Sequence, residues 1–199
     1  MLEFETYIEQ CVVKVLGELD GTAFWVLPEY CLTCYHLLSS KHRPKKVNIE
    51  YKGQPFTAEF RPDLSNPEED LAVLYAGGAT GHSAPLGAVQ DLDVEVRAHG
   101  YRTGFPKAYT VTGILRPGQE SDKGFVYNWE TNQPAGSSIQ GMSGCPVFDP
   151  RRMLVIGLTY AKKSGVRASV TSTRLRKSIA AGRTCQRRTP RSRPGSSQA

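Results

Sequence analysis

The apolar residues of this 199-residue chain come in short runs, and glycines and prolines separate one run from the next. Nineteen glycines and thirteen prolines are scattered in this way, a pattern that favours many strands and tight turns over long helices. The segment 45–51 alternates apolar and polar residues, which is the period of a half-exposed strand. The chain is therefore expected to be all-β, and its length permits one domain or two small subdomains that share an interface.

The expected strands fall into two blocks, joined by a glycine-rich loop at 77–83. The first block holds 11–16, 21–27, 31–35, 45–51, 56–60 and 70–75. The second holds 94–99, 109–115, 124–128, 146–148, 153–160 and 168–171. Ser172 is a suitable N-cap for a closing helix from Thr173 to Ala181, and Gly182 would end that helix.

A serine stands between two glycines in the sequence Gly-Met-Ser-Gly at 141–144, just before the apolar run 146–148. Glycine tolerates backbone angles that a Cβ forbids, so the chain can turn tightly here and direct successive N–H groups outward. The N–H groups of Gly141 and Ser143 could then converge where an oxyanion would form if Ser143 attacked a carbonyl. A plain glycine turn between two strands also fits these residues, so the motif requires partners.

A nucleophilic serine needs a base, and the base needs a group that orients it. His36 falls where an apolar strand leaves the sheet, and Asp70 directly precedes the apolar run 71–74. In isolation His36 fits a structural strand-end histidine, and Asp70 fits a turn-capping acid. Their order along the chain, His, Asp, Ser, favours the catalytic interpretation. The rival acids do not directly precede such a run; they are Asp63, Asp91 and Asp93.

These motifs resemble those of trypsin-like serine proteases of the chymotrypsin clan, above all the short, disulfide-free HtrA-type peptidase domains. Gly-Thr-Ala-Phe-Trp-Val at 21–26 is similar to the family's Gly-Thr/Ser-Gly-Phe strand, and Leu-Thr-Cys-Tyr-His at 32–36 to its Leu-Thr-Ala-Ala-His. Asp-Leu-Ala-Val-Leu at 70–74 resembles Asp-Ile/Leu-Ala-Leu-Leu. Further matching blocks lie at 85–87 with 99–101, at 141–144 and at 154–158. The resemblance covers roughly residues 10–182.

The resemblance implies two six-stranded Greek-key β-barrels of the chymotrypsin type with a short C-terminal helix. Their expected bounds are 1–84 and 85–182, and a basic tail follows at 183–199. It also implies a serine endopeptidase that acts through an acyl-enzyme intermediate. His36 would be the general base, Asp70 the orienting carboxylate and Ser143 the nucleophile. The N–H groups of Gly141 and Ser143 would form the oxyanion hole.

By the same resemblance, a protein or peptide substrate would contact a pocket with no carboxylate in its lining, so a preference for Lys or Arg is not expected. The lining residues would be Ser137, Ile139, Gln140, Thr159, Tyr160, Ala161 and Ala168. Three basic residues border this pocket and could favour acidic substrate side chains or belong to a solvated loop; they are Lys162, Lys163 and Arg167.

The residue before Ser143 is Met142, whereas secreted trypsin-like zymogens have an aspartate there that pairs with a freed N-terminus. Activation by that ion pair is therefore not expected, and a regulatory partner or oligomerisation could order the loop instead. The chain also resembles trypsin-like modules that are fused to, or encoded beside, bacterial conflict-system proteins, which suggests a role in bacterial defence.

The formal charge of +6 is concentrated at the end of the chain, since five arginines lie in the segment 183–193 and no acid follows residue 182. Such a composition predicts a solvated tail, and a nucleic-acid partner is not expected, although a basic arm is the alternative. No cofactor is expected. No apolar run is long enough to span a bilayer, and no signal peptide precedes the first strand, so a membrane partner is not expected either.

Five cysteines, at positions 11, 31, 34, 145 and 185, suggest no disulfide framework and favour a cytoplasmic location. Cys31 and Cys34 have the spacing of a redox or metal motif. Residues three apart on a strand face opposite sides, however, and no second Cys/His pair is present, so no metal is expected. A barrel module that binds without turnover is the alternative function, and the complete set of His36, Asp70 and Ser143 argues against it.

Overall fold

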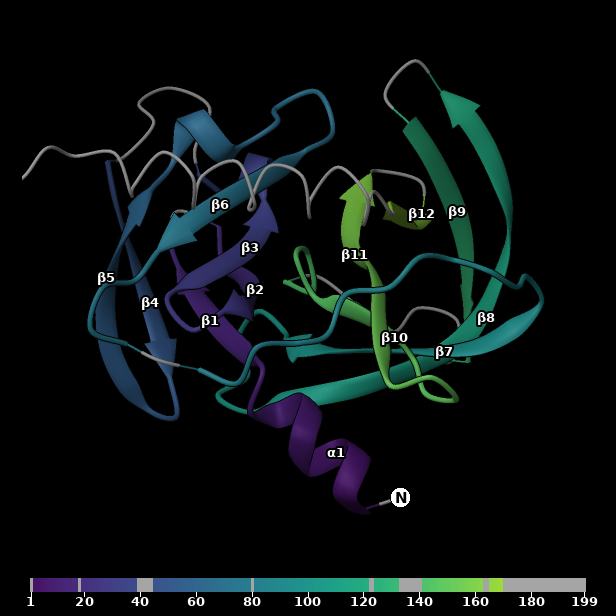
Figure 1. The fold of residues 1–199 in the computed structure, drawn as a ribbon, viewed down its shortest axis with the longest axis horizontal. Helices are drawn as coiled ribbons and strands as arrows, with labels where there is room; N and C mark the ends of the chain where they lie inside the picture. The colour runs from purple at the N-terminus through teal and green to yellow at the C-terminus, as the bar shows by residue number, and fades with distance from the viewer. Residues whose placement is uncertain are drawn as a thin grey trace, which may run out of the picture.

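The computed structural model describes residues 2–17, 19–38, 45–79, 81–121, 124–132, 141–162 and 165–169. In these residues the strands form two closed barrels of six strands each, which lie side by side in Figure 1. The first barrel contains β1 (Val12–Leu16), β2 (Gly21–Leu27), β3 (Tyr30–Cys34), β4 (Lys46–Tyr51), β5 (Gln54–Phe60) and β6 (Leu71–Tyr75). The second contains β7 (Val94–Tyr101), β8 (Ala108–Ser121), β9 (Gly124–Thr131), β10 (Pro146–Asp149), β11 (Leu154–Lys162) and β12 (Gly165–Ser169).

Both barrels have the same strand order. The first runs β1-β2-β3-β6-β5-β4, and the second, read from its first strand, runs β7-β8-β9-β12-β11-β10. Antiparallel pairing of β1 with β4 closes the first barrel, and pairing of β7 with β10 closes the second. The expectation of an all-β, chymotrypsin-like pair of barrels is therefore confirmed. The expected boundary between residues 84 and 85 falls in the segment that joins β6 to β7.

Alternation along the strands divides the apolar side chains between three clusters. Trp25 packs inside the first barrel with Ile49, whereas its neighbour Phe24 faces the junction with the second barrel. We call that junction the interbarrel cluster; it includes Phe24, Leu32, Cys34, Val73, Phe148, Val155 and Leu158. Phe24 and Phe148 are almost fully buried there, and burial of each such side chain contributes about 1.5–3 kcal/mol. The barrels are thus joined by a hydrophobic core of their own.

The described chain also contains one α-helix, α1 (Leu2–Glu9), and two short 3-10 helices, η1 (Tyr35–Leu38) and η2 (Pro62–Leu64). Helix α1 lies below the barrels in Figure 1 and packs Ile8 and Tyr7 against the interbarrel cluster. The sequence interpretation did not predict it. The expected closing helix lies outside the described residues. No helix in the described ranges is long and apolar enough to cross a bilayer.

Candidate active site

The pairing between β3 and β6 determines which residue His36 contacts. In this pairing Cys34 lies opposite Leu71, so the chain that leaves β3 meets the residue that precedes β6. The amide of Tyr35 donates to the Asp70 carbonyl oxygen at 2.9 Å. The amide of His36 donates to Asp70 Oδ1 at 2.8 Å, and His36 Nδ1 lies 2.7 Å from Asp70 Oδ2. The structure therefore brings the two predicted residues into direct contact.

The contact between the imidazole and the carboxylate fixes the tautomer of His36. An ionised carboxylate only accepts hydrogen bonds, so the neutral imidazole must carry its proton on Nδ1. The lone pair of Nε2 is then available to accept a proton from another group. The His36 amide and ring thus both contact the Asp70 carboxylate, and both side chains are partly exposed to solvent.

Asp70 adopts a left-handed backbone conformation, with φ of +54°. This conformation is uncommon outside glycine, although aspartate adopts it more readily than most residues. The hydrogen bonds from the amides of Tyr35 and His36 hold the residue in place. Backbone strain of this kind often occurs at functional sites, where the surrounding structure maintains it.

The three rival acids are engaged elsewhere. Each forms an ion pair with an arginine: Asp63 with Arg61, Asp91 with Arg151, and Asp93 with Arg116. The sequence argument that preferred Asp70, based on the apolar run after it, therefore identified the acid that lies beside His36.

Ser143 belongs to the second barrel but is held by the first. Its carbonyl oxygen accepts a 2.9 Å hydrogen bond from the amide of Thr22 on β2, and Thr22 in turn accepts a 2.7 Å bond from the hydroxyl of Thr33 on β3. The amide of Gly144 donates to the Thr159 carbonyl at 2.7 Å. The strand that leads to His36 and the turn that carries Ser143 are thus joined by one buried network.

The Gly-Met-Ser-Gly turn has the backbone that the sequence predicted. Gly141 and Gly144 both have positive φ, +93° and +83°. A Cβ on Gly144 would lie 2.0 Å from the Thr22 carbonyl oxygen, and one on Gly141 would lie 2.3 Å from the Thr103 amide nitrogen. Glycine is therefore required at each position by close packing as well as by conformation.

Met142 anchors this turn by apolar packing. Its side chain is 2% exposed and lies in the core of the second barrel with Val147 and Ile156. The Met142 carbonyl accepts a hydrogen bond from the Thr159 hydroxyl. The position that carries an ion-pairing aspartate in secreted relatives, as the resemblance implies, is therefore occupied here by a core residue.

The predicted substrate-contacting residues are only partly described. Ser137, Ile139 and Gln140 lie outside the described residues. Tyr160 and Ala161 belong to β11, and Ala168 on β12 pairs with Thr159. Thr159 is 2% exposed, and its hydroxyl donates a hydrogen bond to the Met142 carbonyl oxygen. Its side chain therefore supports the serine turn. Sequence reasoning missed this role, because a β-branched residue in a strand gives no separate signal.

The thiols occupy the positions that strand alternation predicted. Cys31 packs inside the first barrel, whereas Cys34 faces the interbarrel cluster. Cys145 is fully buried in the second barrel. The four described cysteines are all free, and burial raises the pKa of Cys31 and of Cys34 well above the usual value.

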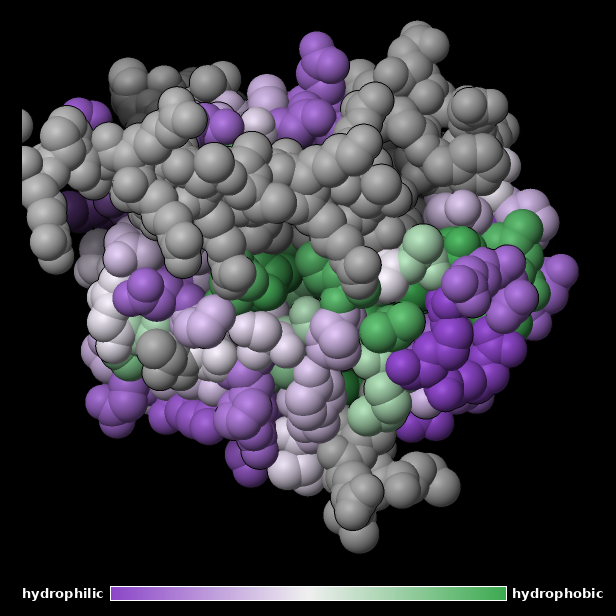
Figure 2. All heavy atoms as spheres, viewed as in Figure 1, coloured by the Kyte–Doolittle hydropathy of each residue, from purple (hydrophilic) through white to green (hydrophobic). Residues whose placement is uncertain are grey.

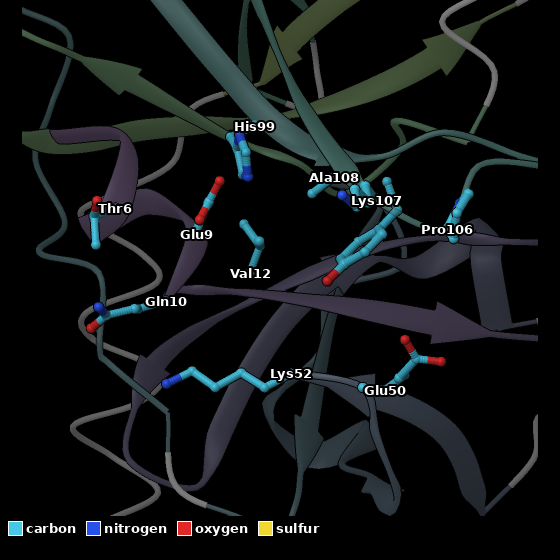
Figure 3. Close-up of a pocket in the computed structure, with 12 residues that line it drawn as sticks. Thr6, Glu9, Gln10, Val12, Glu50, Lys52, His99, Pro106, Lys107 and Ala108 are labelled. Carbon is cyan, nitrogen blue, oxygen red and sulfur yellow. The ribbon is translucent and has the colours of Figure 1, made fainter. Parts of the chain in front are cut away.

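A separate pocket of about 580 Å³ lies between α1, β7 and the turn from β4 to β5. Figure 3 shows His99, Glu9 and Lys52 among its lining residues. The His99 side chain is buried, with Nδ1 2.9 Å from the Thr110 hydroxyl, and burial lowers the pKa of His99 from 6.5 to about 4. This pocket does not include His36, Asp70 or Ser143 in its lining.

Arg116 on β8 forms ion pairs with both Asp93 and Glu130. The positive charge of Arg116 is thus balanced by two neighbouring carboxylates. Figure 2 shows hydrophilic side chains, in purple, gathered toward the right of the view.

Two closed barrels with a histidine and an aspartate in contact at their junction define a protein of the chymotrypsin-like class. The family model described as "Trypsin-like peptidase domain" matches residues 21–158. The chain belongs to this family and is a serine-type endopeptidase.

Solved structures share the fold. An inactive form of Rv3671c from M. tuberculosis H37Rv superposes with a TM-score of 0.70 at 20% identity, over 92% of this chain and 91% of that one. The crystal structure of Deg5 superposes with a TM-score of 0.67 at 18% identity, over 84% of this chain and 87% of that one. A human pathogenic astrovirus serine protease superposes with a TM-score of 0.61 at 19% identity, over 83% of this chain and 92% of that one. No curated protein sequence matches this chain.

Proposed function

We propose that the chain hydrolyses peptide bonds in protein or peptide substrates through Ser143, His36 and Asp70, with an acyl-enzyme intermediate. The observation that carries the proposal is the 2.7 Å contact between His36 Nδ1 and Asp70 Oδ2. It directs the basic nitrogen of the imidazole away from the carboxylate, in a chain that belongs to a peptidase family.

In the first half of the reaction, His36 Nε2 takes the hydroxyl proton of Ser143 while Ser143 Oγ attacks the substrate carbonyl carbon. Asp70 stabilises the imidazolium that forms. The N–H groups of Gly141 and Ser143 bind the oxyanion, and each such donor contributes roughly 3–4 kcal/mol to the transition state. His36 then returns its proton to the leaving amine, and the acyl group stays on Ser143.

In the second half, His36 takes a proton from water as the water attacks the acyl carbonyl, and Ser143 leaves with the returned proton. Hydrogen bonds between a serine and its base commonly tighten only when substrate is bound. The buried network through Thr22 and Thr33 supports this step, because it keeps the serine turn fixed against the strand that leads to His36.

The substrate groove is proposed along β11 and β12, beside Tyr160, Ala161 and Ala168. We further propose that the protein works in a reducing compartment such as the cytoplasm. The support is chemical: the described cysteines are free and buried, as they are in proteins that never meet an oxidising environment. A role in bacterial defence, with a regulatory partner, remains a proposal from the resemblance.

The test is covalent labelling of the full chain by a fluorophosphonate, which reacts with activated serines. We expect label on the wild type and none on Ser143→Ala. Digestion of a peptide library, read by mass spectrometry, would give the residue preference on either side of the cleaved bond. A folded wild-type protein that neither takes label nor cleaves any peptide would contradict the proposal and favour a barrel that only binds.

A further inference from the structure

Three different ligand types meet beside the interbarrel cluster. The Sγ of Cys34, a ring nitrogen of His36 and a carboxylate oxygen of Asp70 all lie within 4.8 Å of one another. From the sequence no metal is expected, because Cys31 and Cys34 are predicted to face opposite sides of a strand, and those two thiols do face different cores. The fold instead places Cys34 beside His36, two positions along the chain, and beside Asp70, which the pairing of β3 with β6 brings near.

We propose that this cluster, Cys34, His36 and Asp70, is a Zn²⁺ site, and that the bound ion reversibly blocks the base. Thiolate, imidazole and carboxylate are the three ligand types that zinc uses in proteins, and three protein ligands with a water in the fourth position make an open tetrahedral site. Binding does not depend on the proposed reaction, whereas the inhibition rests on the proposed function.

Zinc binding requires the three ligand atoms to rearrange. A tetrahedral zinc ion with bonds of about 2.0–2.3 Å separates its ligand atoms by roughly 3.3–3.6 Å. His36 Nδ1 and Asp70 Oδ2, at 2.7 Å, would move apart slightly, and the thiol would move in from at most 4.8 Å. Because His36 and Asp70 are partly exposed, an ion and its water can reach them from solvent.

Zinc at this site would reverse the role of the imidazole. The ion takes a lone pair on Nδ1, so the proton that now lies between Nδ1 and Asp70 is released to solvent and Nε2 takes one up from solvent; the ring stays neutral, with its proton on Nε2. Nε2 then donates a hydrogen bond and no longer accepts the serine proton. The Cys34 thiol, which now donates to the Thr159 carbonyl at 3.2 Å, releases its proton to solvent when it binds the ion.

Metal binding is best tested in full-length Ser143→Ala, where turnover plays no part. Co²⁺ is the probe, because a cobalt–thiolate bond gives a charge-transfer band in the near ultraviolet, and Zn²⁺ should displace it. We expect one equivalent of Co²⁺ with this band, and loss of the band in Cys34→Ser, whose hydroxyl can keep the bond to Thr159. Asp70→Asn should weaken binding at least tenfold.

The matched control is Cys31→Ala, a buried thiol three residues away that faces the other core; it should keep the band. The proposal is overturned if the band persists in Cys34→Ser, if it disappears in Cys31→Ala, or if folded protein binds no cobalt. Circular dichroism before each titration establishes that the variant is folded.

A second readout separates the two proposals. Zn²⁺ should slow fluorophosphonate labelling of the wild type, and a chelator should restore it. If the protein binds cobalt through Cys34 but takes no label with or without zinc, the proposed function fails and the metal site stands. If zinc binds at Cys34 and labelling is unaffected, inhibition is refuted.

Discussion

The backbone amide of Thr22 donates a 2.9 Å hydrogen bond to the carbonyl oxygen of Ser143. A strand of the first barrel thereby holds the serine turn of the second. Thr22 is fully buried, and its other polar atoms are used as well: the carbonyl accepts from Thr33 and the hydroxyl from the amide of Tyr101 at 2.9 Å. One residue therefore ties β2, β3, β7 and the serine turn together.

Thr22→Val tests this network, because it keeps the shape of the side chain and removes its hydroxyl. The amide of Tyr101 loses its acceptor, and an unsatisfied buried donor costs roughly 1–3 kcal/mol. We expect the free energy of unfolding, measured in urea, to fall by that amount and labelling of Ser143 to slow. Thr57→Val, on an exposed site of β5, is the control and should change stability by less than about 0.5 kcal/mol. Equal effects of the two substitutions would contradict the role of Thr22.

Gly144→Ala should disrupt the serine turn. The added Cβ would meet the Thr22 carbonyl oxygen at 2.0 Å, which forces the turn to move. Gly53→Ala separates this clash from backbone strain, since Gly53 also has positive φ, +74°, with nothing within 4 Å of the new Cβ. The control should lose about 1–2 kcal/mol for conformation alone. Gly144→Ala should lose more and should abolish labelling. If Gly144→Ala and Gly53→Ala lose the same stability in thermal melts and take label equally, packing against Thr22 does not fix the turn.

Asp70→Asn should lower the rate of peptide cleavage by about 10⁴-fold while the fold remains intact, because an amide no longer enforces a proton on His36 Nδ1. Asp63→Asn is the matched control. It removes one carboxylate of the same type from an ion pair with Arg61 and should leave the cleavage rate unchanged. The measurement is kcat/KM for a peptide identified in the library digest. A loss below tenfold for Asp70→Asn would show that another acid orients the base.

His99 should make the protein less stable in acid. The unfolded chain takes up a proton on this residue near pH 6.5, whereas burial lowers the pKa in the folded state to about 4. Between these values the unfolded state binds more protons, so the free energy of unfolding decreases as pH falls, by at most roughly 3 kcal/mol. His99→Gln should flatten the dependence of stability on pH between 4 and 6.5. His82→Gln, at an exposed histidine, should not. If the free energy of unfolding depends on pH in the same way for the wild type and for His99→Gln, burial of His99 does not destabilise the protein in acid.

The strand pattern could be predicted from the sequence because each barrel strand is short, alternating and bounded by turn residues. Helix α1 could not, since the tertiary contacts of Tyr7 and Ile8 support it, and a helix this short has only a weak period of its own. The contact between His36 and Asp70 was predictable from motif order. The role of Thr22 was not, because packing between the barrels brings its backbone to the serine turn. Thr159 reaches the same turn within the second barrel, through the register of β11 against β10.

The cluster of Cys34, His36 and Asp70 illustrates the same limit. Sequence spacing draws attention to Cys31 and Cys34, which a strand separates onto opposite faces. It gives no indication that the residue before β6 will meet the end of β3, because that depends on which strands become neighbours in the closed barrel.

Met142 has a consequence for how such a protein comes into operation. Because its side chain fills the same core as Val147 and Ile156, the segment that bears the serine is organised by the collapse of the surrounding barrel. An apolar side chain at this position has no charge to offer a newly formed N-terminus, so packing of the barrel, and not an ion pair, holds this part of the turn.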